Sequence, residues 1–383
     1  MVRDFYGKPF SDETKLKLEL FRGYIREWIP VFFTQYTSGK QNYKRINIFD
    51  YFAGSGRDAS GFPGSPLIVV DELKNYCEVN TRLKNSTVKV FLFFYDSDPK
   101  KINELDKNID RIECKQGCCH IKVDTKPFEE ALSDSITVLE NQEAANLVIM
   151  DQFGISNVTP EVVSILARIE TTDILFFIPS SYLRRFKENQ QFLKRQNIDR
   201  SKLGEVGHSQ IHRFIYNHYR TMIPSDAKYY MAPFSIKKGG NIHGILFGSR
   251  SLFGLDKFLK VCWNLDPTTG EANYDIDDDH IRSGQLSLFP DLNVTTKERF
   301  FINSLINMLR TRSVNNHQLY QFVLERGYTP KIASAILRGL QKKGVVDAFQ
   351  ISNQRPARRG AFYITWDNYS KYPPRVLLRL LEP

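Results

Sequence analysis

The chain has 383 residues, 42% of them hydrophobic and 25% charged, with a formal net charge of +10. This composition is typical of a globular protein, and the length allows two domains. The longest apolar or aromatic run, VFLFFY at 90–95, is far too short to cross a bilayer. The start MVRDFYGKPF has no apolar signal segment, and five cysteines in so long a chain favour a reducing compartment. We therefore expect a cytoplasmic protein.

The first half of the chain alternates between helical and strand patterns. Residues 13–36 form an amphipathic pattern that predicts a helix, interrupted or kinked at Pro30. Continuous apolar runs predict strands at 46–52, 88–96, 120–124, 146–151 and 173–179. The segments around 65–76, 98–110, 126–140 and 160–170 predict the helices between them. Apolar strands separated by helices indicate an α/β fold with a parallel sheet covered on both faces.

The pattern changes after the fifth strand. Residues 182–220 are polar, basic and helical, which indicates an insertion. Two further strands, 229–236 and 242–248, are joined by KKGG, a sequence that favours a hairpin. Five parallel strands followed by a C-terminal β-hairpin describe the class I (Rossmann-like) methyltransferase sheet better than a six-stranded parallel dinucleotide fold.

The last part of the chain has a different organisation. An acidic stretch opens a linker over 274–295, and helices are predicted near 296–310, 315–325 and 330–343. VVDAFQI, an arginine-rich loop and GAFYITW follow, which predicts a β-hairpin with a basic tip. We predict four parts: a methyltransferase-like domain (1–273), a linker (274–295), a winged-helix domain (296–370) and a basic tail (371–383).

Positive charge is concentrated in the last fifth of the chain. Residues 296–383 hold fifteen lysines and arginines against five acids, which accounts for the whole surplus of +10. A basic segment of this kind indicates a polyanionic partner. The candidate phosphate contacts are the presumed wing tip and the third helix: Arg355, Arg358, Arg359, Lys342 and Lys343. In the insertion, Arg184, Arg185 and Lys187 alternate with aromatic residues; they fit a nucleic-acid channel or, equally, a solvated helix face.

A glycine loop, IFDYFAGSGRDASGFPGSPL at 48–67, follows the first predicted strand. Gly54, Gly56 and Ala59 fit the dinucleotide pattern G-x-G-x-x-A. Asp50, however, would face a pyrophosphate unfavourably, whereas the sulfonium and ammonium groups of S-adenosylmethionine suit a carboxylate. We therefore predict that the loop holds S-adenosylmethionine. The candidate cofactor residues are Asp50, Phe52, Ala53, Gly54, Gly56, Asp96 for the ribose and Asp124 for the adenine amino group.

The fourth predicted strand ends in Asp151-Gln152-Phe153-Gly154. Amino-methyltransferases place an acid, a proline and an aromatic residue here, so that the carboxylate and a carbonyl align an exocyclic amine and the ring stacks on its base. Asp151 and Phe153 fit this pattern, and Gln152 stands where proline is expected. A strand end capped by Asp and Gly is the structural alternative.

These motifs resemble the three-Cys-motif partner (TcmP) family of methyltransferase-like proteins. The matching stretches are KLKLELFRGYIREWI, DYFAGSG with GSPL, DQFG, NIHGILFGSRSLFGLDKFLKVCWNLDPTTG and GQLSLF. The resemblance implies a class I methyltransferase fold, a bacterial setting, cofactor contacts at Asp50, Gly54, Gly56 and Asp96, and a three-Cys-motif protein as partner. The family's usual D-P-F-G box resembles that of tRNA guanine dimethyltransferases, which points to nucleic acid as substrate.

The leading hypothesis is a methyltransferase acting on an exocyclic base amine of RNA or DNA. The alternative is a catalytically degenerate, nucleic-acid-binding partner of a three-Cys-motif protein. We predict no metal site, since the adjacent pair Cys118 and Cys119 suits a tetrahedral centre poorly and no second cysteine pair follows. Gln285–Phe289 (QLSLF) resembles a sliding-clamp docking peptide, although its apolar residues could instead fasten the linker.

Overall fold

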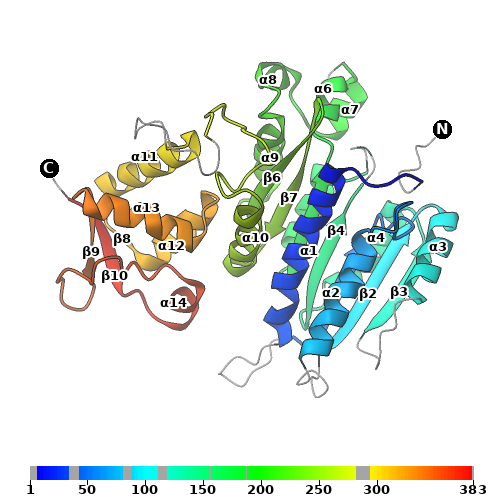
Figure 1. Ribbon diagram of the computed structural model, residues 1–383, viewed down its shortest axis with the longest axis horizontal. Coiled ribbons are helices and arrows are strands. Elements are labelled where there is room, and N and C mark those ends of the chain that lie inside the picture. The colour runs from blue at the N-terminus through cyan, green and yellow to red at the C-terminus, as the bar shows by residue number, and fades with distance from the viewer. Residues whose placement is uncertain are drawn as a thin grey trace. The chain divides into compact units, whose positions relative to one another are not determined.

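The computed structural model describes residues 7–33, 43–80, 88–110, 119–152, 154, 157–186, 188–281 and 294–381 (Figure 1). The chain divides into two compact units, Met1–Val261 and Cys262–Pro383. The domain boundary that the sequence predicts, at residue 273, falls inside the second unit. None of the described helices is long and apolar enough to span a bilayer.

The first unit is built on a seven-stranded sheet in the order β3-β2-β1-β4-β5-β7-β6, counted over its described residues. The strands are β1 (Arg45–Asp50), β2 (Lys89–Asp96), β3 (His120–Thr125), β4 (Ala144–Met150), β5 (Thr172–Ile178), β6 (Tyr230–Lys238) and β7 (Asn241–Ser249). The pairs among β1 to β5 are parallel, and β7 runs antiparallel to β5 and β6. Every residue of β4 is buried, as expected for a strand covered on both faces. The predicted α/β fold with a mostly parallel sheet is confirmed.

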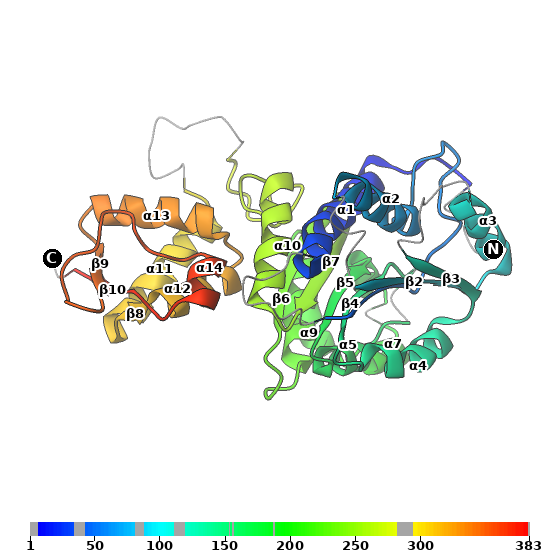
Figure 2. The ribbon, with the colours of Figure 1, turned by 90° about the horizontal axis from the view of Figure 1, so that it is seen from below.

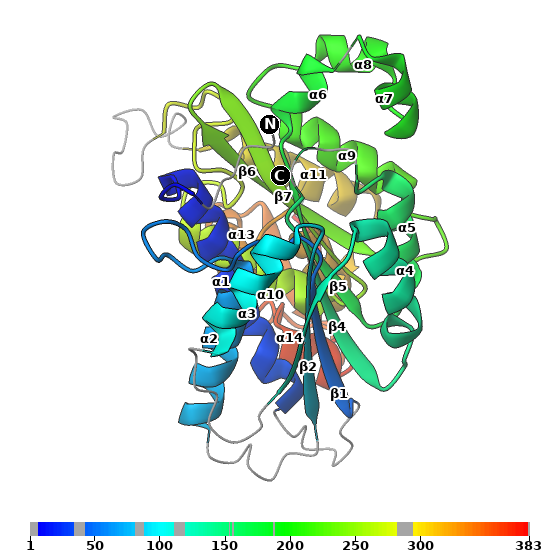
Figure 3. The same ribbon diagram turned by 90° about the vertical axis from the view of Figure 1, so that its right-hand side faces the viewer.

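Helices cover both faces of this sheet (Figures 2 and 3). One face carries α1 (Asp12–Phe33), α2 (Ser65–Val79), α3 (Pro99–Asp110) and α10 (Leu252–Leu265). The other carries α4 (Phe128–Leu139), α5 (Pro160–Arg168) and α9 (Ile211–Met222). The short helices α6 (Ser181–Arg185), α7 (Gln190–Arg195) and α8 (Arg200–Glu205) follow the carboxyl end of β5 and, with α9, form the predicted helical insertion.

Polar side chains as well as apolar ones attach α1 to the sheet. Tyr24 Oη and Trp28 Nε1 both donate to Asp173 Oδ2 of β5, at 2.7 and 2.9 Å. Asp173 is half-buried, and these two donors replace hydrogen bonds with water that its carboxylate gives up on folding. The predicted interruption of the helix at Pro30 is wrong: α1 continues through Pro30 to Phe33, although proline lacks the N–H that would donate to the carbonyl oxygen of Arg26.

The second unit combines helices with a three-stranded sheet in the order β8-β10-β9. After the end of α10 come α11 (Thr296–Thr311), β8 (Val314–Asn315), α12 (Asn316–Glu325), α13 (Pro330–Lys342), β9 (Val346–Gln350), α14 (Trp366–Lys371) and β10 (Val376–Leu380). Thr295, Asn315 and Thr329 cap the first turns of α11, α12 and α13, which are the local signals that the sequence carries for these helices.

The strand pairing in this unit differs from the sequence prediction. β9 does not form a hairpin with 360–366; it pairs antiparallel with β10, from Val376↔Gln350 to Leu380↔Val346. The supposed basic tail therefore contains the central strand of the sheet. The reason is burial, since Val376 and Leu378 are 2% and 1% exposed and bring an apolar edge to the core. Tyr363, with a φ of 51°, also interrupts the extended conformation of the 360–366 segment.

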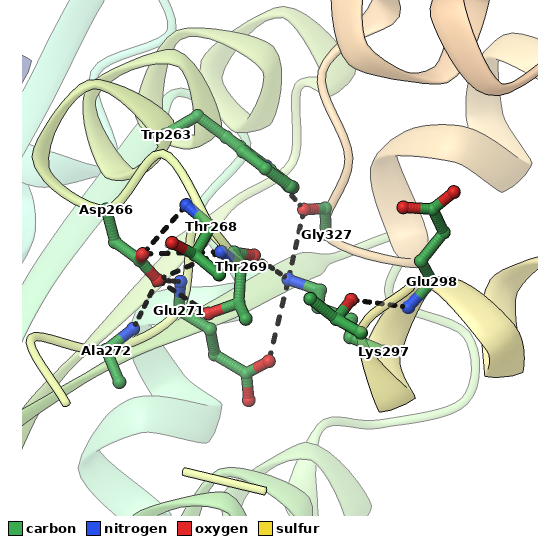
Figure 4. Close-up of polar contacts among 10 residues, drawn as sticks. Trp263, Asp266, Thr268, Thr269, Glu271, Ala272, Lys297, Glu298 and Gly327 are labelled. Carbon is green, nitrogen blue, oxygen red and sulfur yellow. Dashed lines mark hydrogen bonds and ion pairs between the residues drawn. The ribbon is translucent and has the colours of Figure 1, made fainter. Parts of the chain in front are cut away.

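A buried polar cluster holds residues 266–272 against the rest of the second unit (Figure 4). Asp266 accepts hydrogen bonds from backbone N–H groups of the turn that follows it, including Thr268 at 3.0 Å and Glu271 at 3.1 Å. Lys297 Nζ of α11 donates to Thr269 O at 2.7 Å and Gly327 O at 3.3 Å, and lies 3.5 Å from Glu271 Oε2. These contacts explain why the unit begins before the boundary that composition predicts.

We expect the variant Lys297→Met to destabilise the second unit by roughly 3 kcal/mol, since the side chains of Lys297 and Glu271 are only 13% and 10% exposed and loss of the lysine leaves a buried carboxylate without its cation. Denaturant unfolding followed by tryptophan fluorescence measures the loss. The control is the exposed Lys331→Met, which should change the free energy of unfolding by less than about 0.5 kcal/mol. Equal stability of the two variants would contradict the role given to Lys297.

Candidate functional site

Three acidic side chains lie at the carboxyl edge of the parallel strands. Asp50 ends β1, Asp96 ends β2 and Asp151 follows β4 directly. β1 lies between β2 and β4 in the sheet, so the three residues come from adjacent strands. Open α/β sheets bind ligands at the carboxyl ends of the strands, at the point where the order of the strands changes direction. In this sheet that point lies between β1 and β4.

Asp50 is completely buried, and one oxygen of its carboxylate makes no hydrogen bond of normal geometry within the described residues. Oδ1 accepts a hydrogen bond from Phe52 N at 3.1 Å, whereas Oδ2 makes none of normal geometry with a described residue. Burial raises the pKa of Asp50 to about 7; the Ser65 hydroxyl and the Phe52 N–H oppose this shift, and the charges of Asp151 and Asp96 reinforce it. A buried acceptor without a donor carries a free-energy cost, so this position fits a ligand that brings a cationic donor.

The glycine loop that follows β1 is shaped by its own backbone. Gly54 and Gly56 have φ values of 63° and 84°, a region that glycine adopts without strain. A Cβ at Gly56 would also lie 2.7 Å from Leu105 Cδ1, so a larger residue would force the Leu105 side chain to shift. Gly54 N donates to Asp96 Oδ2 at 3.0 Å, and Ala53 N donates to Tyr95 O at 2.9 Å. The loop is therefore fastened to the end of β2, and Asp96 is one of its anchors.

Asp58 organises the rest of the loop. Its carboxylate accepts hydrogen bonds from the backbone N–H groups of Ser60, Phe62 and Phe10, at 2.9, 2.8 and 2.6 Å. α2 then begins at Ser65, with Gly64 as its N-cap and Pro66 in its first turn. The loop is a closed turn that also fixes the segment before α1, and sequence reasoning missed this role of Asp58.

The remaining cofactor candidates have partners of their own. The Phe52 ring stacks on Phe128, with centroids 5.2 Å apart. Asp124, one residue before the end of β3, lies 3.4 Å from Lys122 Nζ and 3.9 Å from Lys126 Nζ, and within the described residues it makes no hydrogen bond or ion pair with the glycine loop. The structure therefore brings Asp50, Ala53, Gly54, Gly56 and Asp96 together, and it leaves Asp124 between two lysines.

Asp151 forms an ion pair that the sequence did not predict. Lys17 Nζ of α1 donates to Asp151 Oδ2 and also lies over the Phe177 ring, 4.5 Å from its centroid. The side chains of Lys17 and Asp151 are only 10% and 17% exposed. Asp151 Oδ1 accepts no hydrogen bond from a described residue, so one carboxylate oxygen is held and the other is available. The signal in the sequence was a lysine within the buried stripe of an amphipathic helix.

Gln152 has a structural position. Its side chain is buried, and Oε1 accepts hydrogen bonds from Asn157 N at 3.1 Å and Val158 N at 3.0 Å. It thereby closes the turn between β4 and α5, while its Nε2 makes no hydrogen bond with a described residue. Phe153, the predicted stacking residue, lies outside the described residues.

His243 of β7 extends the site towards the hairpin. Its ring stacks on Phe177 at 5.7 Å, on the ring that Lys17 contacts. Burial lowers the pKa of His243 to about 4, and nearby Lys238, Lys17 and Arg185 contribute. His243 is therefore neutral at physiological pH, and its Nδ1 makes no hydrogen bond with a described residue.

The basic residues of the insertion serve different purposes. Arg184 donates to Val206 O, which fastens α6 to the segment after α8. Arg185 is exposed and donates to Asn241 Oδ1 at 2.7 Å. Lys187 lies outside the described residues. Of the three predicted nucleic-acid contacts in this segment, Arg185 has an exposed side chain, whereas Arg184 uses its guanidinium for a hydrogen bond within the protein.

The basic candidates of the second unit are exposed. Arg355, Arg358 and Arg359 lie in the connection after β9, and among the described residues their guanidinium groups make no hydrogen bond or ion pair. Lys342 and Lys343 end α13 and are also exposed. These five residues share the second unit, and none of them makes an ion pair with a carboxylate that the structure describes.

The other sequence candidates do not form sites within the described residues. Cys118 and Gln285–Phe289 lie outside them, and no cluster of potential metal ligands occurs in the part that the structure describes. His212 is enclosed between Ser180 Oγ at 2.8 Å and Ile245 O at 3.2 Å, so it is a core histidine.

Comparison with known proteins gives distant structural similarities. No protein-family model matches the chain, and no curated protein matches it. A solved Escherichia coli protein assigned as a methyltransferase, yhhF, is 11% identical, with a TM-score of 0.30, over 65% of this chain and 92% of that one. Trm1 from Pyrococcus horikoshii, solved with S-adenosyl-L-methionine, is 10% identical, with a TM-score of 0.38, over 98% of this chain and 92% of that one. A Listeria monocytogenes protein assigned as a class I S-adenosylmethionine-dependent methyltransferase is 11% identical, with a TM-score of 0.28, over 63% of this chain and 62% of that one.

Proposed function

We propose that this protein is an S-adenosylmethionine-dependent methyltransferase that acts on an exocyclic base amine of RNA or DNA. The observation that carries the proposal is the unpartnered, buried Oδ2 of Asp50 beside the glycine loop. A dinucleotide would bring a diphosphate to this carboxylate, which repels it, whereas S-adenosylmethionine brings cationic groups.

The residues of the glycine loop fit this cofactor. Asp50 Oδ2 would accept a hydrogen bond from a cationic group of the methionine part. Gly54 and Gly56 allow the ligand to approach the backbone without a Cβ in the way. Asp96 is already an anchor for Gly54 N, and its remaining lone pairs would accept the ribose hydroxyl groups. The cofactor supplies an electrophilic methyl group.

The ion pair of Lys17 and Asp151 supports the acceptor half of the proposal. Lys17 holds Oδ2 and fixes the carboxylate, so Oδ1 would accept a hydrogen bond from the substrate amine and orient its lone pair. We propose that Asp151 positions the amine. The stacking role of Phe153 stays a prediction from the sequence. Gln152 would act by holding the turn in place.

The second unit would bind the nucleic acid. Its helices α11, α12 and α13 and its antiparallel sheet fit the winged-helix type that the sequence predicts, with the β9–β10 connection as the wing. The exposed arginines of that connection would contact phosphates, a sequence-independent source of affinity.

A second candidate function is a scaffold that binds nucleic acid and a three-Cys-motif protein without methyl transfer. Two observations favour it: Lys17 already occupies one oxygen of Asp151, and Gln152, in place of proline, is used to close the turn. The two candidates differ in one measurement, the transfer of labelled methyl groups from the cofactor to total RNA or DNA.

Cofactor binding should depend on pH through Asp50. Its folded pKa of about 7 exceeds the ordinary value of 3.8, so the carboxyl is protonated below pH 7 and cannot pair with a cation. We expect S-adenosylmethionine affinity to increase about eightfold between pH 6.0 and 7.5. Isothermal titration calorimetry measures this, and Asp50→Asn should bind weakly with no such dependence.

A wild-type affinity that is constant over this pH range would contradict the prediction, because it would show that the cofactor does not pair with the Asp50 carboxylate. The same linkage predicts that the cofactor-free protein loses stability as pH increases from about 4 to about 7. In this range Asp50 is already ionised in the unfolded chain, whereas in the folded protein it still holds its proton.

A further inference from the structure

Exposed apolar side chains of the second unit gather around one arginine. Seven large hydrophobic side chains are exposed among the described residues. Two of them contact Arg375, whose guanidinium lies 4.1 Å from the ring centre of Tyr372 and 5.5 Å from that of Tyr363. A third, Ile351, is joined to the same segment through its backbone N–H, which donates to Arg375 O at 2.9 Å. We call Ile351, Tyr363, Tyr372 and Arg375 the aromatic platform.

The backbone that presents this platform is strained and clamped. Tyr363 has a φ of 51°, a left-handed conformation that a bulky residue adopts only where its surroundings enforce it. The buried Asn316 holds this conformation in place: its Nδ2 donates to Tyr363 O at 3.1 Å, and its Oδ1 accepts from Arg375 N at 2.7 Å. One side chain thus holds the two segments that carry Tyr363 and Arg375.

Charge and exposure decide what the platform fits. Tyr372 and Tyr363 are 47% and 36% exposed, and Arg375 makes no ion pair within the described residues. Residues 296–383 hold a surplus of ten positive charges, which favours an anionic partner. Aromatic rings beside an unpaired guanidinium are the arrangement on which unpaired bases stack while their phosphates are neutralised. A duplex offers no free base face to such a surface.

We propose that the aromatic platform binds bases of a single-stranded or locally unpaired nucleic-acid segment by stacking on Tyr372 and Arg375. This inference rests on the proposed nucleic-acid function and adds to it the strand state of the substrate. It also separates two tasks, because the arginines of the β9–β10 connection would bind phosphates whereas the platform binds bases.

Fluorescence anisotropy with the full chain tests the inference. The probes are labelled single-stranded RNA and DNA oligonucleotides of mixed sequence, and the same strands annealed to their complements. Tyr372→Ala should weaken single-strand binding by about 5- to 150-fold, the usual effect of losing one stacked base. The salt slope should stay unchanged because a ring neutralises no phosphate. Tyr372→Trp should retain binding, and duplex affinity should change by less than about twofold.

The control is Ile165→Ala in the first unit, which removes an apolar side chain of matched exposure, 49%, and should leave binding unchanged. Arg375→Lys keeps the charge but not the planar stack, and should weaken single-strand binding alone. Unchanged single-strand binding by Tyr372→Ala, as a protein-docking platform would give, overturns the inference, and so does an equal loss on duplexes. A wild type that binds no nucleic acid instead overturns the proposed function.

Discussion

Asp151→Asn is expected to abolish methyl transfer, with a loss of at least about 100- to 1000-fold, because the amine then has no carboxylate to position it. The same change leaves Lys17 as a buried cation without its partner. Since both side chains are less than one fifth exposed, the free energy of unfolding should fall by about 3 kcal/mol. A loss of activity in this variant alone would therefore not distinguish chemistry from folding.

The double variant Lys17→Met/Asp151→Asn separates the two effects. Removing both charges of a buried pair is often neutral for stability, so this variant should unfold near the wild type while remaining inactive. Cofactor affinity should change by less than about twofold. A control is Lys257→Met/Glu27→Gln, which removes the ion pairs of Glu27 with Lys257 at 2.8 Å and with Lys260 at 2.6 Å further along α1 and should keep full activity.

The decisive measurement is methyl transfer together with calorimetric cofactor binding for all of these variants. Full turnover in Lys17→Met/Asp151→Asn would refute the role of Asp151. A wild type that binds the cofactor but transfers no methyl group to any RNA or DNA would instead support the scaffold function.

Replacing Arg355, Arg358 and Arg359 together with alanine is expected to weaken nucleic-acid binding on the order of 100-fold at 0.15 M salt. Each arginine that neutralises a phosphate releases counterions from the polyanion, so the salt slope should fall by up to about three units. The loss should be similar for different sequences if the contacts are to phosphates. Anisotropy titrations at several salt concentrations measure both quantities.

A charge-matched control accompanies this variant. Lys89, Lys100 and Lys107 are exposed lysines of the first unit, and their replacement by alanine removes the same net charge. This control should change the slope by less than about one unit. If both triple variants lose affinity equally, net charge rather than the β9–β10 connection is responsible, and the proposed wing contact is wrong.

The two experiments address different units of the protein. Asp151 and Lys17 belong to the first unit, whereas the three arginines belong to the second. A protein that keeps cofactor binding but loses nucleic-acid binding, and its converse, would show that the two functions are carried separately.

The α/β class, the hairpin of β6 and β7 and the glycine loop follow from the sequence alone. Their signals are local: apolar runs of strand length, a Gly-Gly turn, and Gly54 and Gly56 directly after a strand that ends in Asp50. Each depends on residues close together in the chain, where periodicity and backbone preference act.

Only the tertiary structure decided the features that depend on distant residues. Lys17 meets Asp151 across 134 positions; the amphipathic pattern of α1 places the lysine on the buried side, but no local pattern identifies its partner. β9 pairs with β10 rather than with 360–366, because buried apolar strands compete across the whole unit. Lys297 binds the 266–272 turn and thereby moves the boundary of the second unit. The unpartnered Oδ2 of Asp50 is likewise a result of burial, which is set by everything packed around a residue and not by its neighbours in sequence.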